Sequence, residues 1–301
     1  MATPSAMALF YDRNWRLAVQ RVVDVLVAQQ KSSAEDAASP CGPAYTFSRN
    51  NIAGQGPLNS LVNGVGPPAR TSGMIRSAFR PSDDACSFPF HVPANAMAVV
   101  ELRATATLLR TCFGDGDLLA LRCDALAAEI DVGIAKHGIV HRAEYGGSVF
   151  AYEVDGFGNA MLMDDANLPS LLALPWLGYV AESDPIYLRT RAYVLSNRSN
   201  PWFFSGSAGE GVGSPHTGPR TIWPLGIIMR ALTSTSDVEI ADALTTLKGS
   251  AAAPDSWLMH ESFHANDASS FSRPWFAWAN SLFAELVVKL SRERPHLVGI
   301  V

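Results

Sequence analysis

The sequence predicts a mainly helical protein, and three observations support this prediction. Segments with apolar residues three or four positions apart recur along the chain, as on one face of a helix. Segments in which apolar and polar residues alternate are few, and loops rich in Gly, Pro, Ser and Asn separate the helical segments. Apolar residues make up 48% of the 301 residues and charged residues 17%, which is typical of a globular chain with a sizeable core.

The first half of the chain is expected to contain three helices and one long connection. Residues 12–30 carry an apolar stripe at helical spacing, whereas residues 31–73 are rich in glycine, proline and serine. Residues 93–112 begin with a proline, which is common in the first turn of a helix. Residues 115–138 form the third expected helix, with Asp117 as its N-cap.

The second half begins with residues 149–163, where alternation and aromatic residues predict a short strand or hairpin. The glycine-rich residues 205–218 are expected to form a loop. Five further helices are expected, at residues 168–180, 184–196, 221–234, 237–250 and 276–294.

Composition excludes several classes of function. The net charge of -5 gives no electrostatic reason to expect binding to nucleic acid or to an anionic membrane. The N-terminus lacks the basic and apolar regions of a signal peptide, and no apolar run approaches the roughly 20 residues of a membrane span. The four cysteines are scattered, which favours buried thiols over a zinc knuckle or a disulfide framework. We expect a soluble chain, with its compartment and oligomeric state left open.

One short motif allows two opposite interpretations. His260, Glu261 and His264 have the spacing with which zinc proteases hold a metal ion on one helix face, and Glu285 is available as a third ligand. Against this, the residues on both sides of the motif are typical helix breakers. In the alternative interpretation, Glu261 is a catalytic carboxylate of an enzyme that needs no metal.

Four segments suggest a carbohydrate pocket, because as a group they combine carboxylates with aromatic, amide and glycine residues. Sugar rings present apolar faces to aromatic side chains and hydroxyl groups to amides and carboxylates. Glycoside hydrolysis further requires two carboxyl groups, one as proton donor and one as base or nucleophile. The four segments are residues 76–90, 152–170, 211–224 and 257–280.

These segments resemble glycoside hydrolase family 125, the metal-independent exo-α-1,6-mannosidases, and the resemblance runs from about Phe10 to near Leu290. It implies the (α/α)6 barrel of the six-hairpin glycosidases, with a few short strands in loops and a single domain over residues 1–301. It also implies an inverting mechanism without metal or cofactor. The general acid is implied in "RPSDDA", as Asp83 or Asp84, and the general base in "MHES", as Glu261.

The resemblance also implies a mannose-containing oligosaccharide or N-glycan as substrate. From the charge and the apolar pattern we expect neither nucleic acid nor membrane as partner. Candidate substrate-binding residues follow from membership of the four segments and from side-chain chemistry, whereas His264 is expected to be structural. The candidates are Arg80, Asp155, Asp164, Asp165, Asn167, His216, Trp223 and His260.

One departure from the family leaves two alternatives. The family carries a Trp-Leu-Arg-Asp-Ser motif in a region before the helix expected at residues 12–30, and this motif does not occur in the sequence. The chain therefore resembles the C-terminal two-thirds of a family member, with a barrel incomplete at its N-terminal side. The alternatives to an active mannosidase are an inactive or glycan-binding relic and a zinc peptidase using His260, Glu261 and His264.

Overall fold

The computed structural model describes residues 8–49, 60–252 and 256–299. The chain forms two compact units, each assembled from stretches that are separate in sequence. The first unit contains Met1–Arg80, Ala85–Val140 and Glu153–Met161, and the second contains Pro81–Asp84, His141–Tyr152 and Leu162–Val301. The single (α/α)6-type domain expected over residues 1–301 stays a prediction.

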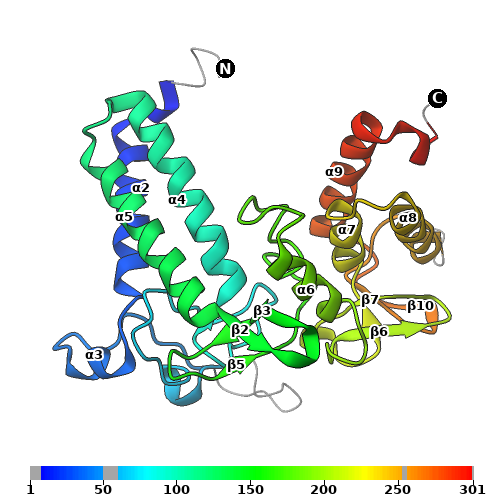
Figure 1. The fold of residues 1–301 in the computed structure, drawn as a ribbon, viewed down its shortest axis with the longest axis horizontal. Helices are drawn as coiled ribbons and strands as arrows, with labels where there is room; N and C mark the ends of the chain where they lie inside the picture. Colours follow the sequence, from blue (N-terminus) through cyan, green and yellow to red (C-terminus); the bar gives the residue numbers. More distant parts are fainter. Residues whose placement is uncertain (1–7, 50–59, 253–255, 300–301) are drawn as a thin grey trace. The chain divides into compact units, whose positions relative to one another are not determined.

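The first unit is dominated by three long helices, α2 (Arg13–Ala28), α4 (Val92–Phe113) and α5 (Leu118–Gly133), which lie side by side (Figure 1). They confirm the three helices predicted for the first half of the chain. Asp117 caps α5 as expected, because its carboxylate accepts a hydrogen bond of 2.9 Å from the backbone N–H of Ala120.

The remaining elements of the first unit are short. A three-stranded antiparallel sheet has the order β1–β4–β5, so the hairpin predicted within residues 149–163 is confirmed. The predicted irregular connection, residues 31–73, contains two short helices in its described part. The short elements are α3 (Ser33–Ala38), η2 (Val62–Gly64), β1 (Phe90–His91), the π-helical turn η3 (Ile134–Gly138), β4 (Glu153–Val154) and β5 (Ala160–Met161).

A buried ion pair fixes the centre of the first unit. Arg80 Nε donates to Glu153 Oε1 at 2.6 Å, and both side chains are almost fully buried. The other oxygen of Glu153 accepts from the backbone N–H groups of Ser87 and Phe88, at 2.9 and 3.0 Å. Glu153 therefore connects β4 to the segment that leads into β1.

The second unit is built on four helices, α6 (Pro185–Val194), α7 (Pro224–Leu232), α8 (Asp237–Ala252) and α9 (Ala277–Glu293). Every residue of α7 is buried, because this helix packs against both α8 and α9. Four of the five helices predicted for this half of the chain are thereby confirmed.

The fifth predicted helix, at residues 168–180, is wrong, because this segment forms consecutive turns. The backbone N–H groups of Leu171 and Leu172 donate to the Asp164 carboxylate, at 2.9 and 3.0 Å. The carbonyl of Leu172 accepts from the Tyr187 hydroxyl, and Pro175 has no N–H to donate. Tertiary hydrogen bonds thus replace the helical ones that the apolar pattern predicted.

The strands of the second unit are short and more numerous than the sequence indicated. Residues 205–218, expected as a loop, in fact form part of the β6–β7 hairpin and the turn η5. Glycine is required there, since a Cβ on Gly213 would lie 2.1 Å from the carbonyl oxygen of Thr221. The elements are β3 (Gly147–Phe150), β6 (Phe203–Gly206), β7 (Gly209–Val212), β8 (Thr221–Ile222), β9 (Ser262–His264), β10 (Asp267–Ser272), and the 3₁₀ turns η4 (Ala143–Tyr145), η5 (Pro215–Thr217) and η6 (Pro295–Leu297).

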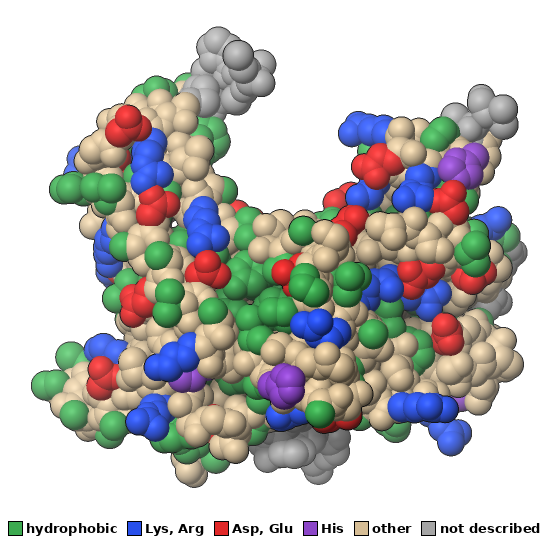
Figure 2. Space-filling view, in the orientation of Figure 1, with side chains coloured by type: hydrophobic (Ala, Val, Ile, Leu, Met, Phe, Trp, Pro, Cys, Tyr) green, Lys and Arg blue, Asp and Glu red, His purple; other side chains and the backbone are tan. Residues whose placement is uncertain are grey.

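One antiparallel sheet, of order β10–β9–β8, supports the candidate site described below. Strand β2 (Ile139–Arg142) begins in the first unit, ends in the second and pairs with β3. Acidic and basic side chains are interspersed on the face shown in Figure 2, without a broad patch of one sign. Within the described residues, no helix is long and apolar enough to cross a membrane.

Candidate active site

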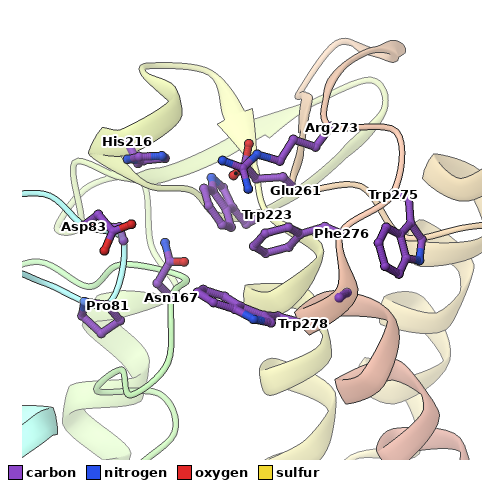
Figure 3. A pocket seen from close by; sticks show the side chains of 12 residues that line it. Pro81, Asp83, Asn167, His216, Trp223, Glu261, Arg273, Trp275, Phe276 and Trp278 are labelled. Atoms are coloured by element: carbon purple, nitrogen blue, oxygen red, sulfur yellow. Dashed lines mark ion pairs between the residues drawn. The ribbon is translucent and has the colours of Figure 1, made fainter. Parts of the chain in front are cut away.

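The second unit contains a cavity of about 380 Å³ that brings together carboxylates, an imidazole and four large aromatic side chains (Figure 3). Five of the residues proposed from the sequence line it, namely Asp83, Asn167, His216, Trp223 and Glu261. The other lining residues are Pro81, Ser82, Arg273, Trp275, Phe276, Ala277 and Trp278.

A tight loop presents Asp83 to the cavity. Phe79 and Ala85 form an antiparallel bridge on either side of this loop, and Asp83 adopts the left-handed conformation, with φ of 70°. Asp is one of the few residues that tolerate this conformation, and backbone strain of this kind is concentrated at functional sites. Asp83 is exposed, whereas the neighbouring Asp84 is buried, with 3% of its surface accessible.

Asp84 is held by His216 rather than presented to the cavity. The distance between His216 Nδ1 and Asp84 Oδ1 is 3.1 Å. The hydrogen bond to Asp84 raises the pKa of His216 above its ordinary value, and the charges of Asp84, Glu261 and Asp165 act in the same direction, against partial burial. The imidazole therefore carries a positive charge to a higher pH than a free histidine and faces the same cavity as Asp83.

Glu261 lies at the open end of the β9–β10 hairpin. Ser262 pairs with Ser272 across the hairpin, and the two hydroxyl oxygens are 2.8 Å apart. Ser272 Oγ donates to Glu261 Oε2 at 2.9 Å, and Arg273 Nε lies 3.2 Å from Glu261 Oε1. Each carboxylate oxygen of Glu261 thus has one partner, and the strand pairing fixes where the carboxylate points.

The ion pair between Arg273 and Glu261 joins an exposed side chain to a buried one. The Arg273 side chain is 61% exposed, whereas that of Glu261 is 7% exposed. The backbone of Arg273 has a φ of 44°, and its guanidinium lies 5.7 Å from the centre of the Phe276 ring. Solvent and ligands therefore reach Arg273 directly.

Aromatic side chains form one wall of the cavity. Trp223 and Phe276 are buried and contact each other edge to face, with ring centres 5.8 Å apart. The ring centres of Trp278 and Phe276 are 5.2 Å apart. Figure 3 shows Asp83 and His216 across the cavity from Phe276 and Trp275. This combination of carboxylates and aromatic rings is typical of a site that binds a sugar.

Two buried polar atoms of the cavity wall have no hydrogen-bond partner among the described residues, Ser82 Oγ and Asn167 Oδ1. The Asn167 amide is oriented by Asp165 Oδ1, which accepts from its Nδ2 at 2.8 Å and from its backbone N–H at 2.9 Å. Asp165 Oδ2 also accepts from Ser214 Oγ at 2.9 Å. Buried polar atoms are nearly always paired, so these two are available to the hydroxyl groups of a bound ligand.

Three other candidates of the second unit lie outside the cavity wall. Asp165 acts through Asn167, as described above. Asp164 is fully buried and holds the turns after it by accepting two backbone N–H groups; burial raises its pKa to about 7, although these hydrogen bonds oppose the shift. His260 is also fully buried, stacks on Phe271 at 4.0 Å, and its Nδ1 donates to the carbonyl of Pro274 at 2.9 Å.

The remaining two candidates, Arg80 and Asp155, belong to the first unit. Arg80 is paired with Glu153 as described above. Asp155 accepts hydrogen bonds from the backbone N–H groups of Phe157 and Asn159 and from the Asn159 side chain, and these bonds lower its pKa against partial desolvation. The role of both residues in binding sugar stays a prediction.

Sequence reasoning included residues 257–280 in a segment that suggests a carbohydrate pocket, but named none of the cavity residues from Arg273 to Trp278 as a site residue. The available signal was the motif Arg-Pro-Trp-Phe-Ala-Trp, which places aromatic residues beside an arginine at the start of a helix. No spacing rule showed that this motif faces Glu261, because the hairpin that joins them is short and irregular, with a shift in register between Asp267 and Phe271.

His260 and His264 do not lie on a helix, as the metal-site interpretation requires, because the motif is in an extended segment that ends in β9. His264 Nδ1 accepts from the backbone N–H of Asn266, and Glu285 accepts from the Trp176 indole. No group of three or more His, Cys, Asp or Glu side chains suited to a metal ion is found in the described part of the chain.

Comparison with known proteins gives a consistent result. The sequence model of a family described as metal-independent alpha-mannosidase (GH125) matches residues 2–288. The "Meiotically up-regulated gene 157 protein" of Schizosaccharomyces pombe is 46% identical over 285 residues, which cover 94% of this chain and 55% of that protein. This chain therefore spans little more than half the length of that relative.

A solved structure from Streptococcus pneumoniae is similar as well, with a TM-score of 0.84 and 36% sequence identity. The match covers 93% of this chain and 62% of that chain. That protein is described as one of the widely distributed metal-independent alpha mannosidases, in a non-productive substrate complex with alpha-1,6-mannobiose.

Proposed function

Because the chain belongs to glycoside hydrolase family 125, the metal-independent α-mannosidases, we propose that it releases terminal α-1,6-linked mannose from an oligosaccharide or N-glycan, with inversion. The observation that carries this proposal is the cavity, in which an exposed Asp83 and a hydrogen-bonded Glu261 share one site with an aromatic wall. The α-1,6 linkage is suggested by the disaccharide bound to the Streptococcus pneumoniae protein.

In the proposed reaction Glu261 is the general base. It takes a proton from a water molecule as the water oxygen attacks the anomeric carbon and the glycosidic bond breaks. Ser272 and Arg273 keep the carboxylate oriented, and its position in the cavity wall brings it within reach of water.

Asp83 is the proposed general acid, because it lines the cavity. In this role it donates its proton to the leaving oxygen. Asp84, buried and bound to His216, positions the loop instead. An inverting pair requires the acid and base to stand about 6.5–9.5 Å apart, with room for the attacking water.

The hydroxyl groups of the terminal mannose are proposed to pair with Asn167 Oδ1 and Ser82 Oγ, the two buried atoms of cavity-lining residues that lack a partner among the described residues. Trp223 and Phe276 would cover the apolar face of the sugar ring. Direct pairing is favourable because an unpaired buried polar atom costs about 1–3 kcal/mol.

For the architecture we propose the (α/α)6 barrel, of which this chain supplies a part. The mainly helical structure and the similarity to the Streptococcus pneumoniae protein support this proposal. Since the match covers 62% of that chain, a folded but inactive or purely glycan-binding protein is the alternative to be tested.

The test is to incubate the purified 301-residue chain with α-1,6-mannobiose and to measure free mannose, with and without EDTA. We expect release that EDTA does not change and that Glu261→Gln lowers by about 10²- to 10⁴-fold. NMR of the first product should show β-mannose, because inversion of an α-linkage gives the β-anomer.

Glu285→Gln is the matched control, since the zinc-peptidase interpretation requires Glu285 and the mannosidase proposal does not. Loss of release in this variant, or with EDTA, would overturn the metal-free mechanism. A folded protein that binds mannobiose and releases no mannose would support the glycan-binding alternative.

A further inference from the structure

The aromatic wall of the cavity has a buried inner part and an exposed outer part. Trp223 and Phe276 expose 1% and 8% of their surface. Trp275 and Trp278 also line the cavity, yet each is 58% exposed. We call Trp275 and Trp278 the tryptophan rim. Large apolar side chains left in water beside a polar cavity are typical of a surface that another molecule covers.

The backbone under the tryptophan rim is firmly held. The backbone N–H of Phe276 donates to the carbonyl of Met259 at 3.0 Å, and the Asn280 side chain donates to the carbonyls of Met259 and Phe276 at 2.9 and 2.8 Å. Asn280 Oδ1 also accepts from the backbone N–H of Met259. The rim residues therefore stand on a fixed segment at the start of α9, so little conformational entropy is lost when a ligand binds.

The rim also has unused hydrogen-bonding capacity. The indole N–H of Trp223, in the inner wall, donates to Thr217 Oγ1 at 2.8 Å. Neither indole N–H of the tryptophan rim donates to another of the described residues. An exposed indole of this kind offers an apolar face and a polar edge at once, which suits a sugar ring with its apolar face and its hydroxyl groups.

We propose that Trp275 and Trp278 form a stacking platform for the sugars beyond the one that is released. This inference rests on the proposed function, because it assumes that the terminal mannose occupies the inner cavity. In the view of Figure 3, Trp275 lies beyond Phe276 from Asp83, whereas Trp278 lies beside Phe276 on the side nearer to Asn167. An extended glycan whose terminal sugar is next to Asp83 and Glu261 would continue over the rim, so the protein would prefer oligosaccharides to simple mannosides.

The test compares two substrates in Trp275→Ala and Trp278→Ala. One is a linear α-1,6-mannotriose, and the other is α-mannosyl fluoride, which has no sugar beyond the reacting one. With mannotriose we expect kcat/KM to fall about 3- to 10-fold per tryptophan, mainly through KM, because one ring-on-ring contact is lost. With the fluoride we expect less than about a twofold change. Trp257→Ala is the matched control, since Trp257 is 63% exposed and does not line the cavity.

Binding separates failure of the platform from failure of the proposed function. Mannotriose binding is measured by calorimetry in Glu261→Gln, alone and combined with each rim substitution or with Trp257→Ala. Weaker binding in the two rim combinations, with unchanged binding in the Trp257→Ala combination, supports the platform even when no variant releases mannose. Equal losses on both substrates, unchanged mannotriose kinetics in the rim variants, or absence of mannotriose binding would overturn it.

Discussion

Arg80 and Glu153 in the first unit, and Arg273 and Glu261 in the second, are the same two residue types in different surroundings. The Arg80–Glu153 side chains are 3% and 0% exposed, and Glu153 also accepts two backbone N–H groups. The Arg273 side chain is 61% exposed, and each oxygen of Glu261 has a single side-chain partner. The first pair is closed to solvent and holds the fold, whereas the second is open to a cavity and is available for chemistry.

The same contrast separates the two adjacent aspartates of the cavity loop. Asp84 is buried and bound to His216, whereas Asp83 is exposed and lines the cavity. A carboxyl group can donate a proton to a ligand, or accept one from water, only where that molecule reaches it. A position in the cavity wall, rather than residue type or exposed area, therefore distinguishes the candidate catalytic groups Asp83 and Glu261 from Asp84 and Glu153.

The first prediction concerns the two adjacent aspartates, Asp83 and Asp84, and the rate of catalysis. Asp83→Asn should lower kcat for α-1,6-mannobiose by about 10²- to 10⁴-fold, because no acid then protonates the leaving oxygen. Hydrolysis of α-mannosyl fluoride should change little, since fluoride leaves without a proton. Steady-state kinetics on both substrates provide the measurement. If Asp84→Asn, and not Asp83→Asn, shows this dependence on the leaving group, Asp84 is the acid.

The second prediction concerns the closed pair. Glu153→Gln should lower the free energy of unfolding by about 3–5 kcal/mol, because Arg80 then remains buried without its counter-charge. Glu261→Gln should change it by less than about 1 kcal/mol, since its partner Arg273 is solvated. Urea denaturation of the two variants tests the difference. Equal destabilisation would contradict the assignment of one pair to the fold and the other to the site.

The third prediction concerns the pH dependence of stability. Burial raises the pKa of Asp164 from 3.8 to about 7, so the folded state holds a proton that the unfolded state has released. The free energy of unfolding should therefore fall as pH rises between these values, by up to about 1.4 kcal/mol per pH unit. The raised pKa of His216 acts in the same direction, because its stabilising charge is lost as pH rises through that pKa.

Asp164→Asn isolates the contribution of Asp164. Denaturation midpoints measured from pH 4 to 8 should fall less steeply with pH in this variant, since an amide does not titrate. Asp242→Asn, at an exposed position on α8, is the control and should keep the slope of the parent protein. An unchanged slope in Asp164→Asn would show that Asp164 is ionised in the folded state across this range.

The fourth prediction concerns the pair of Arg273 and Glu261 at the cavity. Arg273→Gln should change the free energy of unfolding by less than about 1 kcal/mol, because the guanidinium is solvated. It should lower kcat about tenfold, which corresponds to about 1.4 kcal/mol, since Ser272 alone then orients Glu261. Arg273→Lys should recover most of this loss. An unchanged kcat in Arg273→Gln would remove Arg273 from the positioning of the base.

Most helices could be predicted because their signals are local. The apolar spacing of α2, α4 and α9, and the N-cap Asp117 of α5, are properties of adjacent residues. The helix predicted at residues 168–180 was wrong for a tertiary reason, since Asp164 takes the N–H groups that the helix would have used. The glycine-rich segment 205–218 contains strand rather than loop because neighbouring backbone approaches it closely.

The mainly helical class follows from local sequence patterns, and the resemblance to the α-mannosidase family indicated the carboxylates Asp83, Asp84 and Glu261. The tertiary structure decided which of these groups reach the cavity. It placed Asp84 against His216 and left Asp83 exposed, and it brought Arg273 and the tryptophan rim to the same cavity as Glu261. Burial and ion pairing depend on residues that are distant in the chain, so spacing along the sequence carries no direct signal for them.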